Sequence, residues 1–232
     1  MSQSNMPPTQ LERLATLPTH LQLGMTLVGI TRWADPEQLL IGPIPDGLAV
    51  CEWLKQQGSP HVGEATVLVV AGPHTSIATL VDALANFLEQ QGLREEDTFF
   101  WVCDYVIRQT NVGPDLALLG DCVSAIGHTV LLLEPWNDPQ PLKRAYCIKE
   151  VYHTQVSGAT FDMVMSTAQQ QAFERALVND RSYGDFESIE AGLRLVDVRQ
   201  VPSSTLVAHS GCFLCEHASA TIPLCDSRLL GP

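Results

Sequence analysis

The sequence predicts an α/β protein built on an open, flavodoxin-like parallel sheet with helices on both faces. Two observations lead to this fold class. Between residues 64 and 200, short runs of apolar and β-branched residues alternate with amphipathic segments, and Gly residues follow several of the amphipathic segments. A strand of a parallel sheet is buried on both faces and therefore has a continuous apolar sequence. Strands that alternate with helices in this way form a parallel sheet covered on both sides.

The predicted elements follow one another closely. The first strand is expected in TVLVVAG (66–72), and the helix after it in SIATLVDALANFLEQQG (76–92). Ser76 or Thr75 is a suitable N-cap for this helix, and Gly92 lies beyond its end. Its apolar stripe comprises Ile77, Leu80, Val81, Leu84, Phe87 and Leu88. Further strands are expected at 98–106, 128–134 and 159–166, and further helices at 115–127, 142–154 and 169–180. With short links between such elements, an open flavodoxin-like sheet is the simplest topology.

The composition divides the chain into three parts. Residues 1–63 contain a short apolar run, Pro-rich turns and a helical pattern that ends at Gly58. We expect this part to be an N-terminal extension packed on the core. Residues 64–200 form the α/β domain, and residues 201–232 are a tail rich in Ser, Cys and His.

The seven Cys residues favour reduced thiols, because their number is odd and several lie in core-like segments. The tail contains a C-x2-C pair with nearby His residues, a pattern that can bind zinc. The pair recurs nowhere else, however, and the spacing to Cys225 fits no zinc-finger pattern, so no metal is expected. The tail residues concerned are His209, Cys212, Cys215 and His217.

The charge of the chain excludes some classes of partner. The formal net charge is −13, with only 13 Lys and Arg residues, and such a chain is poorly suited to nucleic acids or anionic membranes. The N-terminal residues lack a signal-peptide pattern, and no apolar run has the length of a membrane span. Together with the reduced thiols, these features predict a cytoplasmic protein.

Ligands of open α/β sheets bind at the carboxyl ends of the strands. Here these ends are predicted at 71–76, 103–111 and 134–141. In the first loop, His74 and Ser76 precede a helix N-terminus, which favours an anionic group, and Gly72 allows close approach to the backbone. The alternative is an ordinary Ser or Thr N-cap.

Two side chains in the other loops remain open to more than one interpretation. Asp104 follows the second strand and can reach the same cleft, or it can cap a turn or face solvent. Trp136 can stack on an aromatic base or fill an apolar space beneath its loop.

Helical spacing alone does not determine whether Glu150 is a surface residue or a functional one. If a helix begins near Leu142, then Leu142, Ala145, Ile148 and Tyr152 form its inward stripe, and Glu150 falls at the boundary of that stripe. On this spacing Glu150 is a solvated side chain that can pair with His153 three residues later. A catalytic carboxylate is the alternative.

The runs FFWVCDYVIRQTN and GHTVLLLEPWNDPQPLKRAYCIKEVYHT resemble a group of TIR-like domains of algae and other protists. The match covers residues 99–154 and extends loosely over 64–200. Its specific part is the pattern IGHT…PW…P-x-PL-x-RA-x-C-x-x-E. More distantly, Cys147 and Glu150 are similar to the Cys-x-x-Glu motif of TIR domains in general.

The resemblance implies a function. In enzymatic TIR domains the motif Glu is needed to cleave NAD at the nicotinamide–ribose bond, so Glu150 is expected to be catalytic. Gly72, His74, Thr75, Ser76, Asp104, Trp136 and Cys147 are expected to form the NAD site. The segment that begins near Asp104 corresponds to a flexible loop used in assembly and cleft gating.

The leading hypothesis is therefore an NAD-cleaving signalling or defence enzyme that self-associates, with NAD as substrate and no metal. The rival hypotheses are a non-catalytic interaction module that recruits other signalling proteins, and a nucleotide-binding sensor without turnover.

Overall fold

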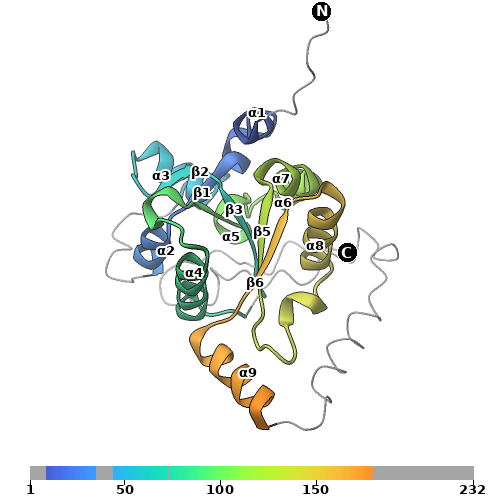
Figure 1. Ribbon diagram of the computed structural model, residues 1–232. Coiled ribbons are helices and arrows are strands. Elements are labelled where there is room, and N and C mark those ends of the chain that lie inside the picture. Colours follow the sequence, from blue (N-terminus) through green and yellow to red (C-terminus); the bar gives the residue numbers. More distant parts are fainter. Residues whose placement is uncertain (1–8, 35–43, 73, 180–232) are drawn as a thin grey trace, which may run out of the picture.

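A six-stranded sheet lies at the centre of the structure, a computed structural model that describes residues 9–34, 44–72 and 74–179. The strands are β1 (Leu23–Met25), β2 (Val62–Glu64), β3 (Val67–Val70), β4 (Phe100–Val102), β5 (His128–Leu132) and β6 (Thr160–Val164). Their order in the sheet is β2-β1-β4-β3-β5-β6 (Figure 1). The last four are parallel, whereas β1 is antiparallel to both of its neighbours. The predicted α/β fold with an open, mostly parallel sheet is therefore confirmed.

Helices pack on both sides of the sheet. In Figure 1, α2 and α4 lie on one side of the strands, and α7 and α8 lie on the other. The α-helices are α1 (Gln10–Leu14), α2 (Leu27–Ala34), α3 (Val50–Gln56), α4 (Ile77–Gln91), α5 (Cys103–Val106), α6 (Val112–Ala117), α7 (Leu119–Ile126), α8 (Ala145–Ser157) and α9 (Thr167–Asn179). The 3-10 turns are η1 (Thr19–Gln22), η2 (Glu95–Asp97) and η3 (Gln140–Lys143).

Helix α4 follows its predicted pattern. Ser76 caps its N-terminus by accepting a hydrogen bond from the Thr79 N–H at 3.0 Å, and Gly92 ends it at a φ of 61°. This left-handed conformation is easily adopted by Gly. The buried side chains of α4 are Ile77, Leu80, Ala83, Leu84, Phe87 and Leu88. Ala83 is buried in addition to the predicted stripe, and Val81, the remaining predicted member, is partly buried against the core.

The second predicted strand, 98–106, is too long. Strand β4 ends at Val102, and CDYV forms the short helix α5. Tyr105 and Val106 are buried, so the apolar run continues into the core without continuing the strand. A continuous apolar run does not distinguish a buried strand from a buried helical turn.

The N-terminal residues extend the sheet beyond β4. Strand β1 pairs with β4 through Met25 and Phe100, and β2 pairs with β1. The indole N–H of Trp101, on β4, donates a hydrogen bond to the Leu21 carbonyl oxygen at 3.0 Å. The first part of the chain thus shares the hydrophobic core of the parallel strands.

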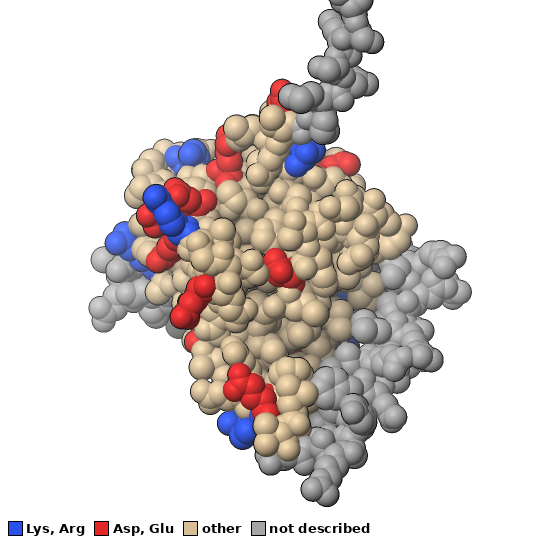
Figure 2. Space-filling view, in the orientation of Figure 1, with Lys and Arg blue, Asp and Glu red and all other residues tan. Residues whose placement is uncertain are grey.

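Exposed charges contribute little to the stability of this fold. Small groups of acidic side chains are spread over the face shown in Figure 2, and basic side chains lie beside some of them. Arg94, for example, pairs with Glu96 and Asp97, and all three side chains are about two-thirds exposed. Such exposed pairs add little to stability. Among the described helices, none has the length and apolar character needed to cross a bilayer.

The close contact between β1 and β4 predicts that the substitution Gly24→Ala destabilises the fold. A Cβ at Gly24 would lie 2.8 Å from the Phe99 carbonyl oxygen, and this backbone atom has little room to move. We expect the free energy of unfolding, measured by urea titration, to fall by about 1–3 kcal/mol. Gly113→Ala is the matched control, because its Cβ would meet no atom within 4 Å. Equal stability of Gly24→Ala and the control would contradict the packing of β1 on β4.

Candidate functional site

The carboxyl ends of β3 and β5 define the candidate site. Strand β4 lies on one side of β3, and β5 lies on the other. The connections leaving the carboxyl ends of β3 and β5 therefore run to opposite sides of the sheet, which is the arrangement that opens a ligand crevice in α/β folds. The loop after β3 leads to α4, and the loop after β5 leads through η3 to α8.

Helix α8 places Glu150 on its inward face. The buried side chains of this helix are Cys147, Glu150 and Thr154, spaced three and four residues apart. The Thr154 hydroxyl donates to the Glu150 carbonyl oxygen at 2.8 Å and lies 2.9 Å from the Thr129 hydroxyl on β5. This contact holds the middle of α8 against the sheet.

The predicted inward stripe of this helix is wrong. The helix begins at Ala145, because residues 140–143 form a 3-10 turn, and Tyr152 is 50% exposed. His153 does not pair with Glu150, and its ring instead faces the backbone of Gly120 on α7. The inward face of α8 consists of polar and small side chains. The pattern of apolar residues therefore could not identify this face from the sequence.

Burial dominates the electrostatics of Glu150. The residue is only 4% exposed, and no hydrogen bond to its carboxyl oxygens is found among the described residues. Burial raises the pKa of Glu150 from 4.5 to about 8. The positive charge of Arg144 opposes this rise in pKa, and the negative charge of Asp104 reinforces it. The carboxyl group of Glu150 is therefore mostly protonated at neutral pH.

Asp104 and Cys103 lie beside Glu150. Both belong to α5, at the carboxyl end of β4. Burial raises the pKa of Asp104, and Arg144 opposes the rise. Burial also raises the pKa of the Cys103 thiol, as do the charges of Asp104 and Glu150. The structure thus brings two carboxyl groups from different elements to one place, with one guanidinium near both.

Cys147 joins α8 to the loop after β3. Its thiol donates a hydrogen bond to the Ala71 carbonyl oxygen at 3.5 Å. Burial is the largest cause of the raised pKa of Cys147, and the charge of Glu150 raises it further. A thiol with a raised pKa is a poor nucleophile at neutral pH. Cys147 therefore acts as a packed donor that fixes the first turn of α8 over the end of β3.

The loop after β3 meets the loop after β5. Gly72 is buried, and a Cβ there would lie 3.0 Å from the Gln140 Cβ. Thr75 is buried, and its N–H donates to the Gly72 carbonyl oxygen at 3.2 Å. His74 is exposed, and Ser76 is the N-cap of α4. Of these four predicted residues, Gly72 and Thr75 lie closest to the connection that leads to α8.

Trp136 packs toward α9. Its side chain is 6% exposed, and its ring lies edge-on to Phe173 with the centroids 5.2 Å apart. The backbone N–H of Trp136 also donates to the Gln169 side-chain oxygen at 3.0 Å. A second anchor is the hydrogen bond from the Ser166 hydroxyl to the Glu134 carboxylate at 2.8 Å. These contacts tie the loop after β5 to the start of α9 rather than to Glu150.

Charged pairs hold the segment that follows α5. The Arg108 guanidinium binds both carboxylate oxygens of Glu52, on α3, at 2.8 and 3.0 Å. The backbone N–H of Arg108 donates to Asp115 at 3.1 Å, and the buried His20 ring nitrogen lies 2.9 Å from the other Asp115 oxygen. The sequence interpretation missed this network, because its members are far apart in the chain.

Arg144 is the second feature that sequence reasoning missed. It is the N-cap residue of α8, and its charge acts on both Asp104 and Glu150. Arg144 lies within the motif that resembles TIR-like domains, but helical spacing gave no reason to select it.

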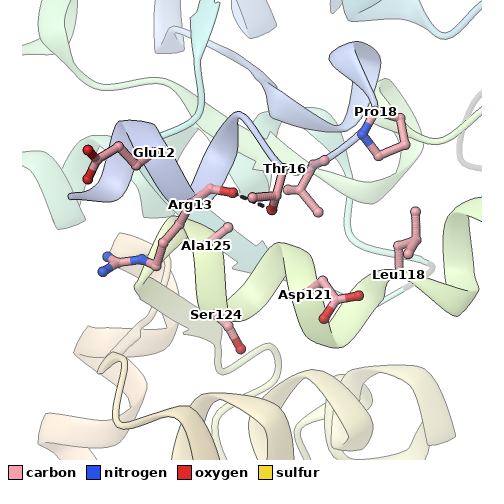
Figure 3. Close-up of a pocket in the computed structure, with 9 residues that line it drawn as sticks. Glu12, Arg13, Thr16, Pro18, Leu118, Asp121, Ser124 and Ala125 are labelled. Carbon is pink, nitrogen blue, oxygen red and sulfur yellow. Dashed lines mark hydrogen bonds between the residues drawn. The ribbon is translucent and has the colours of Figure 1, made fainter. Parts of the chain in front are cut away.

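A separate depression lies at the opposite end of the strands. It has a volume of about 300 Å³ and lies between α1 and α7 (Figure 3). Gln10, at the start of α1, donates hydrogen bonds to the carbonyl oxygens of Ala65 and Ile126, which precede β3 and β5. The depression therefore lies at the amino ends of the parallel strands, where α/β proteins do not usually bind ligands.

Among the described residues, no group of three or more His, Cys, Asp or Glu side chains is arranged to hold a metal ion. The Cys and His residues of the tail lie outside the described ranges. Comparisons with protein-family models, curated proteins and solved structures find no match to this chain.

The burial of Glu150 predicts a pH-dependent stability difference between the wild type and Glu150→Gln. Above about pH 4.5 the unfolded chain releases the Glu150 proton, whereas the folded chain keeps it up to about pH 8. The contribution of Glu150 to stability is therefore lost as the pH rises between these values. We expect Glu150→Gln to gain on the order of a few kcal/mol relative to wild type between pH 5 and pH 8.5.

Urea titrations at the two pH values measure this difference. Glu89→Gln makes the same chemical change on the exposed face of α4 and serves as the control. An equal pH response of wild type and Glu150→Gln would contradict a buried, protonated carboxyl group.

Proposed function

We propose that this protein is a TIR-like domain that cleaves NAD at the nicotinamide–ribosyl bond, with Glu150 as the catalytic carboxylate. The observation that carries the proposal is the position of Glu150. Its carboxyl group is buried without a hydrogen-bond partner among the described residues, on the helix that follows β5 at the ligand-binding end of the sheet. An unpaired buried carboxyl group is costly to maintain, and such groups gather at functional sites.

The residue type fits the reaction. When the glycosidic bond breaks, its electron pair leaves with the nicotinamide nitrogen, and the ribose becomes an oxocarbenium-like cation. A carboxylate beside this cation stabilises it electrostatically and can hold the ribose hydroxyls. Water then attacks the anomeric carbon and loses a proton, which gives ADP-ribose. Nicotinamide is a good leaving group, so one carboxylate suffices without a second acid.

Substrate binding also accounts for the ionisation that Glu150 needs. The pKa of Glu150 is about 8 in the protein alone. The nicotinamide ring of NAD carries a positive charge, which favours the ionised carboxylate when it lies nearby. In the proposed reaction, NAD therefore supplies the charge that converts Glu150 into its active form.

The remaining predicted residues have supporting roles in this proposal. Asp104 lies near Glu150 and is available to ribose hydroxyls. Cys147 fixes the first turn of α8, and the loop with Gly72 and Thr75 contacts the connection that leads to α8. Self-association and a place in the cytoplasm remain part of the proposal.

A non-catalytic interaction module is the second candidate. Exposed apolar side chains favour it, because Tyr152 and Val156 are 50% and 61% exposed on the outer side of α8. Met163, on the edge strand β6, is 59% exposed. The exposed apolar surface of α8 can serve partner binding or self-association without any chemistry at Glu150.

Nicotinamide release from NAD by the concentrated or artificially clustered protein tests the proposal. We expect release by the wild type and a loss of at least about a hundredfold in Glu150→Gln, because one electrostatic contact to the reacting centre is removed. Gln155→Ala, at an exposed position of the same helix, is the control and should retain activity. No release by clustered, folded wild type would reject the enzyme in favour of the interaction module. Release that survives Glu150→Gln would reject the assigned residue.

The pH profile gives an independent test. Since kcat/KM reports the free enzyme, its value should rise about tenfold per pH unit below the pKa of Glu150 and level off above about pH 8. A profile that is flat between pH 6 and 9 would show that ionisation of Glu150 does not limit the reaction.

A further inference from the structure

The N-terminus of α8 is an uncapped helix end at the candidate site. The helix has 13 residues, and no side chain caps its first turn. The hydrogen bond from Cys147 to Ala71 holds this turn at the carboxyl end of β3. The free N–H groups and the helix dipole make such an end favourable for an anion.

Arg144 adds a positive charge at the same helix end. It is half-buried, and the described residues provide no ion pair for its guanidinium. The neighbouring Lys143, by contrast, is paired with Asp138. Asp104 and Glu150 lie near enough for Arg144 to act on them electrostatically, but neither is within ion-pair distance. Arg144 is thus a cation whose five N–H donors are available to a ligand.

The buried carboxyl group of Glu150 is the second, independent sign of a ligand at this place. It belongs to the inward face of α8, less than two turns from Arg144. Side chains on a helix lean toward its N-terminus, so the Glu150 carboxyl group is directed toward the end that carries Arg144. An unpartnered acid and an unpaired cation therefore lie near enough to interact electrostatically, on the helix whose first turn contacts the end of β3.

We infer that Arg144 and the first turn of α8 bind the phosphate-bearing part of the dinucleotide, while Glu150 faces the ribose attached to nicotinamide. This inference rests on the proposed function, and it adds the residue that recognises the diphosphate. A guanidinium binds phosphate oxygens through two parallel hydrogen bonds, and the helix N-terminus reinforces them. Asp104, the other charged group on this side, is placed to bind hydroxyls rather than phosphate, because its charge repels an anion.

Binding measurements with ADP-ribose test the inference without requiring turnover. We expect the wild type to bind ADP-ribose in isothermal titration calorimetry, and Arg144→Gln to bind it on the order of 10- to 100-fold more weakly. Arg144→Lys keeps the positive charge but cannot form the bidentate hydrogen bonds of a guanidinium, so its affinity for ADP-ribose should be intermediate. Lys143→Gln removes the adjacent, already paired cation and should bind like the wild type.

Nicotinamide riboside, which has no phosphate, separates phosphate binding from a general effect on the site. When Arg144 is replaced by Gln, the affinity for nicotinamide riboside should change much less than that for ADP-ribose. An equal loss of affinity for both ligands would overturn the inference, because Arg144 would then act on the site as a whole. Unchanged ADP-ribose affinity in Arg144→Gln, or no binding of ADP-ribose by the wild type, would overturn it as well. Selective loss of ADP-ribose binding in a protein that never releases nicotinamide would support the phosphate site while rejecting the proposed catalysis.

Discussion

The parallel pairing of β3 with strands on both sides is the constraint on which the rest of the structure depends. All four residues of β3 are buried, and the strand pairs with β4 on one side and β5 on the other. Parallel neighbours require crossover connections, and here helices from these connections cover both faces of the sheet. The same pairing brings the carboxyl ends of β3, β4 and β5 to one edge. Glu150, Asp104 and the loop of Gly72 meet there because of the strand order, although nearly 80 residues separate them.

The sequence was sufficient to predict those elements whose buried residues are also the hydrophobic ones. The apolar run of β3 and the stripe of α4 were read correctly for this reason. The inward face of α8 was misread, because Glu150 and Thr154 are buried polar residues and hydropathy assigns them to the surface. The pairing of β1 with β4 could not be predicted, since three-residue strands such as LGM carry almost no periodic signal. The family resemblance selected Glu150 on other grounds, and it is the structure that shows its carboxyl group to be buried.

The environment of Glu150 can be understood as a compromise between folding and ligand binding. Burial raises its pKa, which disfavours the charged form, and the nearby negative charge of Asp104 adds to this effect. The positive charge of Arg144 partly counteracts the rise in the pKa of Glu150, although Arg144 forms no direct ion pair with Glu150. If Arg144 did pair with Glu150, both groups would be satisfied within the protein, and a ligand would have to break that pair before binding. In the proposed binding mode, their separation leaves the acid available to ribose and the cation available to phosphate.

The charged network after α5 bears on how self-association can act on this site. In the proposed function, self-association acts through the segment that begins near Asp104, as the TIR resemblance implies. In the single chain, however, Glu52 and His20 already hold this segment through Arg108 and Asp115. The Arg108–Glu52 pair is bidentate and partly exposed, whereas the His20–Asp115 pair is buried. A partner that bound the Arg108 guanidinium would replace its contact with Glu52, while Asp115 stays buried beside His20 and bonded to the Arg108 backbone N–H. Assembly would then adjust the position of this segment relative to Asp104, because the inner pair keeps its end fixed to the core.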